Sequence, residues 1–270
     1  MVAGLFDNNG SWHEDEVDVN NIIIDYFSNI FMSRPPSHEQ VEAIIHCVTP
    51  RVTPSMNRVL DAPFTPADVK TALFQMYPTK APGIDGLPTL FYQQYWNHVG
   101  DLVTAACLRC LNEGHSVEAF NYTLIVLIPK VQNPIRVTDF RPINLCNVIY
   151  KIVAKVLTNR FRGVLGGAIS NTQSAFLSGR LITDNAVIGF ECIHSIKRQS
   201  KGRVGRLALK LDMSKAYDRV EWDFLRKMML KIGFSSSWTE KIMNCVTTVS
   251  YSILRNGVPM GKIIPSRGLR

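Results

Sequence analysis

The chain has 270 residues, of which 46% are hydrophobic and 19% are charged, so it can bury a sizeable core in one large domain or two modest ones. Its formal net charge is +8, but residues 1–120 carry 6 Lys and Arg against 14 Asp and Glu, whereas residues 121–270 carry 24 against 8. The basic second part is compatible with a solvated surface or with one that neutralises nucleic-acid phosphates. Neither a signal peptide nor an apolar run of about 18 residues is evident, so secretion and a membrane span are not expected.

The six cysteines are scattered along the chain, which excludes a small disulfide-rich scaffold and favours a reducing compartment. Cys107 and Cys110 form a single CxxC pair, without a second pair nearby to complete a four-ligand zinc site. We predict that they are two buried thiols one helical turn apart.

The first part of the chain is predicted to be helical. Residues 1–19 are acidic and polar, and little order is expected there. Thr65, followed by Pro66 and Asp68, is a helix start with an N-cap, a proline at the first helical position and an acid three residues after the cap. The helices predicted here cover residues 20–32, 38–48, 65–77, 88–98 and 101–112.

The second part adds strands. Residues 122–128, YTLIVLI, are apolar and β-branched, which predicts a buried strand, and a loop is expected from there to residue 147. The Asn256-Gly257 dipeptide, between alternating apolar residues, predicts a hairpin over residues 251–264. Residues 197–206, KRQSKGRVGR, are expected to form a basic turn. Further helices are predicted over residues 148–161, 184–197, 218–233 and 238–246.

Asp212 follows directly on an apolar, strand-like segment, residues 207–211. A buried charge is costly unless something pairs with it, so Asp212 either caps the next helix or presents its carboxylate to a divalent ion such as Mg²⁺. Tyr217 adds an aromatic ring close by. Asp218 is predicted to lie in the first turn of the following helix, with a structural role at the positive end of its dipole.

Six short motifs occur in order across residues 65–270, about three quarters of the chain. They are KAPGIDG at 80–86, LIPK at 127–130, FRPI at 140–143, QSAF at 173–176, LDMSKAYD at 211–218 with Trp222 after it, and RGLR at 267–270. Together they resemble the reverse transcriptase of non-LTR (LINE-type) retrotransposons, most of all its plant members. The resemblance implies an α+β, helix-rich right-hand polymerase. An extension or linker would cover residues 1–64, fingers residues 65–206, and an incomplete palm residues 207–270.

The resemblance also implies roles for individual residues. Asp212 would be the first metal-binding aspartate, and the backbone carbonyl of Met213 would face the same ion. Tyr217 would be the aromatic gate that clashes with a ribose 2′-hydroxyl. Lys130 and Arg141 would hold the incoming triphosphate.

Arg267 and Gly268 would begin the motif that lines the template and nucleotide pocket. Other interpretations stay open: Lys130 as a surface lysine, and Arg141 as the ion-pair partner of Asp139. The loop at residues 80–86 is either structural or a template contact. Gln173, Ser174 and Phe176 are either template contacts or polar caps. Trp222 and Phe224 are expected to lie in the core and not to stack on bases.

The activity implied is RNA-directed DNA synthesis, in which two Mg²⁺ ions about 3.5–4 Å apart support addition of dNTPs to a DNA primer on an RNA template. One aspartate cannot hold both ions, and no Asp-Asp dipeptide occurs in the chain. The chain alone is therefore expected to be inactive, without the Asp-Asp motif or a thumb.

Three alternatives remain. They are a non-catalytic nucleic-acid-binding remnant, a product without a stable fold whose 251–264 hairpin lacks sheet partners, and a polymerase of the intron-maturase kind. The resemblance implies work in the nucleus and no membrane partner, and it leaves the oligomeric state open.

Overall fold

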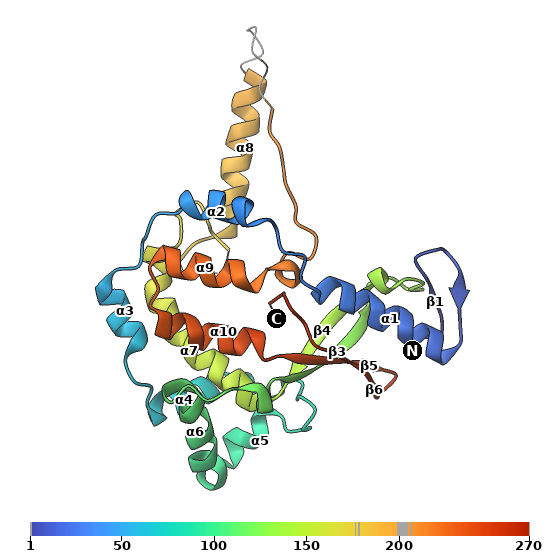
Figure 1. The fold of residues 1–270 in the computed structure, drawn as a ribbon, viewed down its shortest axis with the longest axis horizontal. Coiled ribbons are helices and arrows are strands. Elements are labelled where there is room, and N and C mark those ends of the chain that lie inside the picture. The colour runs from blue at the N-terminus through green and yellow to red at the C-terminus, as the bar shows by residue number, and fades with distance from the viewer. Residues whose placement is uncertain (1, 176, 178, 199–204, 206, 270) are drawn as a thin grey trace.

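The computed structural model describes residues 2–175, 177, 179–198, 205 and 207–269. Figure 1 shows most of the helices gathered at one end of a small sheet and α1 with the N-terminal hairpin at the other. This mixture confirms the predicted α+β, helix-rich architecture. None of the described helices is both long and apolar enough to cross a membrane.

The N-terminal residues are ordered. Strands β1 (Leu5–Phe6) and β2 (Trp12–His13) form an antiparallel hairpin, and α1 (Glu16–Phe31) follows. The carboxylate of Asp15 accepts from the backbone N–H groups of Val17 and Asp18, which satisfies two of the free donors at the start of α1. The expectation of little order in residues 1–19 is wrong, because Leu5 is fully buried against the α1 core.

Capping signals explain the next helices. Thr65 caps α4 (Pro66–Phe74), as predicted, and its hydroxyl accepts from the N–H of Asp68 at 3.3 Å. Thr53 begins the unpredicted α3 (Pro54–Asp61) through the same Thr-Pro pattern. The other helices here are α2 (His38–His46), α5 (Thr89–Gln94) and α6 (Trp96–Asn112). The break between α5 and α6 falls at Tyr95, earlier than predicted.

A four-stranded sheet has the order β4-β3-β5-β6. Strand β3 (Tyr122–Pro129) pairs antiparallel with β4 (Phe140–Cys146) and parallel with β5 (Ser250–Arg255). The loop expected up to residue 147 is therefore wrong in part: β4 lies within it, and its Pro142 is tolerated because β4 is an edge strand.

The predicted hairpin is confirmed as β5 and β6 (Val258–Ile263). Asn256 and Gly257 have φ of 50° and 87°, the left-handed pair that a two-residue turn requires. The expectation that this hairpin lacks sheet partners is wrong, because β5 pairs with β3 along its length.

Two hydrophobic cores hold the fold together. One lies among the helices, including α7 (Val148–Ala168), α9 (Trp222–Ile232) and α10 (Ser236–Thr247). The other joins α1 to one face of the sheet, where Ile23 and Phe27 meet Ile125, Tyr251 and Ile253. Residues before 65 contribute to both cores, and the division of the chain at residues 64 and 206 stays a prediction.

Helix α8 (Ile182–Arg198) projects from the body in Figure 1, and the chain then returns toward it. The returning residues 207–213 are exposed and pair with no other described strand, so the predicted strand at 207–211 is wrong. A short 3₁₀ turn, η3 (Tyr217–Arg219), precedes α9. Most of the expected basic turn at 197–206 lies outside the described residues.

Candidate nucleotide and metal site

Asp212 lies in the extended, exposed segment before η3. The alternative that Asp212 caps the next helix is wrong, because the N-cap residues are Ala216 for η3 and Glu221 for α9. Met213 is 72% exposed beside it. Within the described part of the chain no three His, Cys, Asp or Glu side chains are grouped to hold a metal ion, and the role of Asp212 and Met213 as metal ligands stays a prediction.

The turn at residues 213–219 follows Asp212. Lys215 adopts a left-handed φ of 54°, and its Nζ lies 4.8 Å from the centre of the Tyr26 ring and 5.7 Å from that of Phe27. Tyr217 as a whole is 56% exposed, and its backbone carbonyl accepts from the N–H of Leu269 at 2.7 Å. The role of Tyr217 as an aromatic gate stays a prediction.

Asp218 lies in η3 and not in α9, so its predicted place in the first helical turn is wrong. Its side chain is half-buried, and burial raises the pKa of the Asp218 carboxyl, opposed by the nearby charges of Lys215 and Arg219. The first turn of α9 instead holds Asp223, after the N-cap residue Glu221.

Residues 265–269, here called the strap, cross next to this turn. The N–H of Gly268 donates to the carbonyl of Val220 at 2.8 Å, and its own carbonyl accepts from the indole N–H of Trp222 at 2.8 Å. Gly268 has a φ of 96°, and an added Cβ would lie 2.8 Å from the carbonyl oxygen of Asp218. Only glycine fits this close approach.

Arg267 is fixed within the protein. Its Nε donates to the carbonyl of Ile30 at 2.8 Å, and its Nη1 lies 3.2 Å from a carboxylate oxygen of Glu221. The side chain is only 11% exposed. The strap thus lies beside Tyr217, with the Arg267 side chain turned to α1 and Glu221, and the role of Arg267 and Gly268 in nucleotide binding stays a prediction.

Lys130 and Arg141 lie at the same end of the β3–β4 pair, where Ile128 is the Cα partner of Arg141. The Lys130 Nζ donates to the carbonyl of Thr138 at 2.9 Å. Arg141 is exposed, and the ion pair with Asp139 is not made: the Asp139 carboxylate instead accepts from the backbone N–H groups of Ile135 and Arg136 at 3.0 and 2.9 Å. The role of Lys130 and Arg141 in binding the triphosphate stays a prediction.

The loop at residues 80–86 is tied to the start of α7. The Nζ of Lys151 donates to the carbonyl of Ala81 at 2.9 Å, and a Cβ on Gly83 would lie 2.1 Å from Oδ1 of Asn147. These contacts support the structural interpretation of the loop, and a template contact stays a prediction.

Ser174 is buried, and its hydroxyl accepts from the amide of Asn185 at 2.5 Å, which favours a polar role at the start of α8. Phe176 lies outside the described residues. Trp222 and Phe224 are half-buried, and Trp222 packs against the α1 core, as expected.

Cys107 and Cys110 are confirmed as buried thiols on α6, where burial raises the pKa of Cys107 to about 12.

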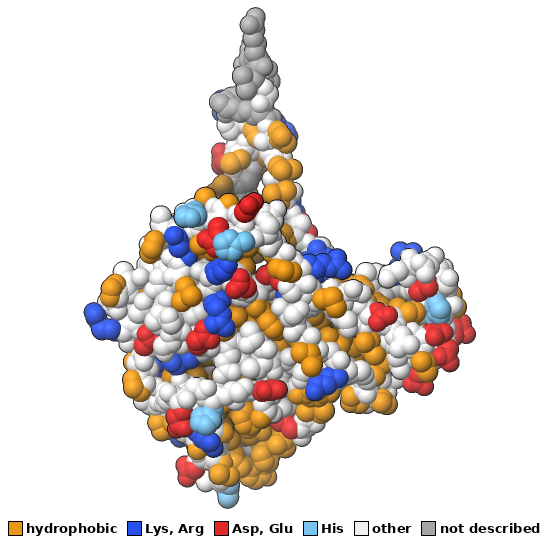
Figure 2. All heavy atoms as spheres, viewed as in Figure 1, with side chains coloured by type: hydrophobic (Ala, Val, Ile, Leu, Met, Phe, Trp, Pro, Cys, Tyr) orange, Lys and Arg blue, Asp and Glu red, His pale blue; other side chains and the backbone are white. Residues whose placement is uncertain are grey.

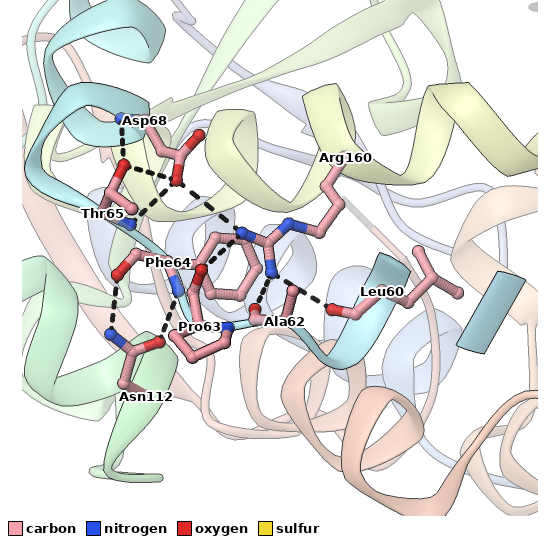
Figure 3. A network of polar contacts seen from close by, with 8 residues as sticks. All are labelled: Leu60, Ala62, Pro63, Phe64, Thr65, Asp68, Asn112 and Arg160. Atoms are coloured by element: carbon pink, nitrogen blue, oxygen red, sulfur yellow. Dashed lines mark hydrogen bonds and ion pairs between the residues drawn. The ribbon is translucent and has the colours of Figure 1, made fainter. Parts of the chain in front are cut away.

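Arg160 is a residue that the sequence did not single out. Its guanidinium donates to the carbonyls of Leu60, Ala62 and Pro63, stacks 3.3 Å from the centre of the Phe64 ring, and lies 3.7 Å from Asp68 (Figure 3). Burial lowers the pKa of Arg160, which nearby carboxylates partly offset. The only signal for this role is an arginine within the apolar pattern of α7.

Charge is unevenly spread over the face drawn in Figure 2. Acidic side chains gather around the β1–β2 hairpin and the start of α1, whereas Lys and Arg are dispersed over that face. The basic surplus of the second part therefore does not form one continuous patch in this view.

The described α+β chain places the Asp212 carboxylate, the Tyr217 ring and the Arg141 guanidinium at exposed positions. Residues 128–266, about half of the chain, match the family described as "Reverse transcriptase (RNA-dependent DNA polymerase)". The chain belongs to the reverse transcriptase family.

Two curated relatives place the chain more closely. It is 28% identical over 225 residues to the "Transposon TX1 uncharacterized 149 kDa protein" of Xenopus laevis, covering 83% of this chain and 17% of that protein. It is 22% identical over 250 residues to the "Retrovirus-related Pol polyprotein from type-2 retrotransposable element R2DM" of Drosophila melanogaster, covering 92% and 22%. The chain thus spans about a fifth of the length of these relatives.

These relatives confirm the resemblance to reverse transcriptases of LINE-type retrotransposons. The closer likeness to plant members stays a prediction. Enzymes of the family act on nucleic acids and generally use divalent metal ions, and the role of Asp212 as a ligand of such an ion stays a prediction.

Proposed function

We propose that this chain supplies the fingers and the first part of the palm of an RNA-directed DNA polymerase. The enzyme would add dNTPs to the 3′-end of a DNA primer on an RNA template, in the nucleus. The observation that carries the proposal is the position of α1, which packs against both η3 and η2 (Val137–Asp139), the turn that leads into β4. One helix therefore supports the end of β4 that bears Arg141 and the turn that follows Asp212.

The residues would share the work as follows. Asp212, with the backbone carbonyl of Met213, would hold one Mg²⁺, which neutralises charge on the triphosphate. Arg141 would bind the triphosphate through its planar guanidinium, with Lys130 as a second cation after release from the Thr138 carbonyl. Tyr217 would lie against the deoxyribose and exclude a 2′-hydroxyl.

Arg267 would act through the backbone of the strap, because its side chain is held by Glu221. A second Mg²⁺ needs further carboxylates, and no Asp-Asp dipeptide occurs in the chain to supply them. The chain alone would therefore bind primer–template and nucleotide without extending the primer.

The test is binding of a fluorescent RNA–DNA primer–template over a salt series. Arg141→Ala is expected to weaken binding and to reduce the salt slope by about 1, as for loss of one phosphate contact. Lys70→Ala, on the exposed face of α4, is the matched control and is expected to change little. Equal effects of the two substitutions would remove the support for Arg141.

A primer-extension assay with Mg²⁺ tests the other half of the proposal. We expect no extension by the chain alone. Extension that disappears in Asp212→Ala would show a complete metal site and overturn the expected inactivity.

The second candidate is a non-catalytic nucleic-acid-binding protein, favoured by the 24 Lys and Arg of residues 121–270. It predicts RNA binding that falls with salt but does not respond to Mg²⁺ or dNTP, whereas the polymerase proposal predicts Mg²⁺-dependent dNTP binding that is lost in Asp212→Asn. A cooperative thermal transition would argue against the third possibility, a chain without a stable fold.

A further inference from the structure

Lys215 differs from its neighbours in the segment that carries Asp212, because its side chain is half-buried. Of residues 207–219, all have exposed side chains apart from Lys215 and Asp218. Lys215 and Asn256 are the two non-glycine residues with positive φ in the described chain, and Asn256 belongs to a tight hairpin turn. A left-handed lysine is sterically unfavourable, so other contacts must stabilise it.

The stabilising contact comes from α1. The ammonium group of Lys215 lies within cation–π distance of Tyr26, at 4.8 Å, and close to Phe27, at 5.7 Å. The Tyr26 and Phe27 rings meet edge to face at 5.2 Å, and Phe27 is buried in the α1 core. The platform under Lys215 is therefore rigid, whereas the turn above it is exposed.

The same helix holds the other side of the turn. The carbonyls of Ile30 and Phe31, at the end of α1, accept hydrogen bonds from the Nε and the backbone N–H of Arg267 at 2.8 and 3.2 Å. The strap then reaches Tyr217 through the N–H of Leu269. Both attachments of the turn thus lead back to α1, which lies outside residues 128–266 that match the family.

Tyr26 also faces the fingers. It lines a cleft of about 600 Å³ together with Arg136 and Thr138 of the β3–β4 connection. The carbonyl of Thr138 is the acceptor for Lys130. Tyr26 therefore adjoins the parts of the chain that carry both proposed triphosphate cations and the proposed gate.

We propose that Tyr26 is a positioning residue of the nucleotide site: its ring holds Lys215, and thereby fixes the bend that places Tyr217 next to the strap. The inference rests on the proposed function, since it assigns Tyr26 to that site. It places a determinant of sugar selection on α1, acting through Lys215 and not through contact with the nucleotide.

Hydrogen exchange of the whole chain is the direct test. In Tyr26→Leu, amides of residues 213–219 are expected to exchange about 2- to 5-fold faster, because the cation–π contact is lost. Tyr26→Phe keeps the ring face and is expected to exchange like the wild type. Lys215→Met removes the same contact without changing α1, and is expected to resemble Tyr26→Leu. Amides of β5 and β6 serve as the internal control.

The second readout is calorimetric binding of Mg²⁺–dATP and Mg²⁺–ATP. We expect the ratio of dATP to ATP affinity to fall in Tyr26→Leu and Lys215→Met and to stay at the wild-type value in Tyr26→Phe. General destabilisation would not give this pattern. Unchanged exchange at residues 213–219 in both contact-removing variants would overturn the inference even if nucleotide binds normally. If the wild-type chain binds neither nucleotide, the proposed function fails, and the exchange rates alone decide whether Tyr26 holds the turn.

Discussion

The carboxylate of Glu221 lies 3.2 Å from the guanidinium of Arg267, and this ion pair joins the N-cap of α9 to the strap. Both side chains are largely buried, at 15% and 11% exposure. The same carboxylate accepts from the hydroxyl of Ser33 at 2.5 Å and from the N–H of Arg34 at 3.2 Å. One buried acid therefore connects the end of α1, the strap and α9.

Glu221→Gln is expected to lower the free energy of unfolding by about 1–3 kcal/mol, because the buried Arg267 loses its counter-charge. Urea denaturation at neutral pH measures the change. The control is Glu240→Gln, which breaks an exposed ion pair with Arg226 on α9 and should cost less than about 1 kcal/mol. Equal losses in the two variants would contradict the structural role given to Glu221.

Gly268→Ala is expected to destabilise the chain by about 1–3 kcal/mol, because the residue has a φ of 96° and a Cβ would lie 2.8 Å from the Asp218 carbonyl. Gly114→Ala is the matched control, with a φ of 74° and nothing within 4 Å of an added Cβ. It should show only the conformational cost, about 1 kcal/mol. Thermal melts of both variants compare the two losses of stability. A smaller loss of stability in Gly268→Ala than in Gly114→Ala would argue against the close approach of Gly268 to Asp218.

Arg160→Met is expected to cost about 2–4 kcal/mol, because it leaves the carbonyls of Ala62 and Pro63 without their donor and removes the cation over Phe64 (Figure 3). Arg162→Met changes an exposed arginine on the same helix and should stay within about 0.5 kcal/mol of the wild type. The midpoints of urea denaturation of the two variants measure the difference in stability. Similar midpoints for both would mean that the Arg160 network adds little to stability.

His13 is expected to give the N-terminal hairpin a pH-dependent stability. Its imidazole lies 3.3 Å from Asp18 and 3.4 Å from Asp7, and hydrogen bonding to Asp18 is the main cause that raises the pKa of His13 in the folded chain. A raised pKa means that the contribution is fully present below the unfolded value of 6.5 and is lost as the pH rises through the higher folded value.

The measurement is the difference in urea midpoint between the wild type and His13→Gln at pH 5.5 and pH 8.5. The difference should be larger at the lower pH. A constant difference across this range would contradict the assigned protonation.

Local signals predicted the elements whose stabilisation is local. The Thr65 cap, the Asn256-Gly257 turn and the apolar run of β3 each satisfy their own backbone or burial requirement within a few residues, and all three are confirmed. The missed β4 has the opposite character. Arg141 and Pro142 read as loop residues, and only pairing with β3 at the sheet edge makes a strand of them.

For residues 207–211 the error is the opposite one: a strand is predicted where the structure has none. Its alternating leucines predict an extended backbone, which is present, but a strand also needs a neighbour to pair with, and the described residues supply none. The apolar alternation can favour an extended backbone, but whether the segment joins a sheet depends on a neighbouring strand.

The sequence by itself determined the family and most helices, because motif order, capping residues and apolar periodicity are read along the chain. Only the tertiary structure decided how the site is supported: that Arg267 turns to Glu221, that Tyr26 lies under Lys215, and that Arg160 closes the turn before α4. These contacts join residues that lie 46 (Glu221 and Arg267), 98 (Ala62 and Arg160) and 189 (Tyr26 and Lys215) positions apart in the sequence, and packing and the burial of charge decide which residues meet. No local pattern encodes that choice.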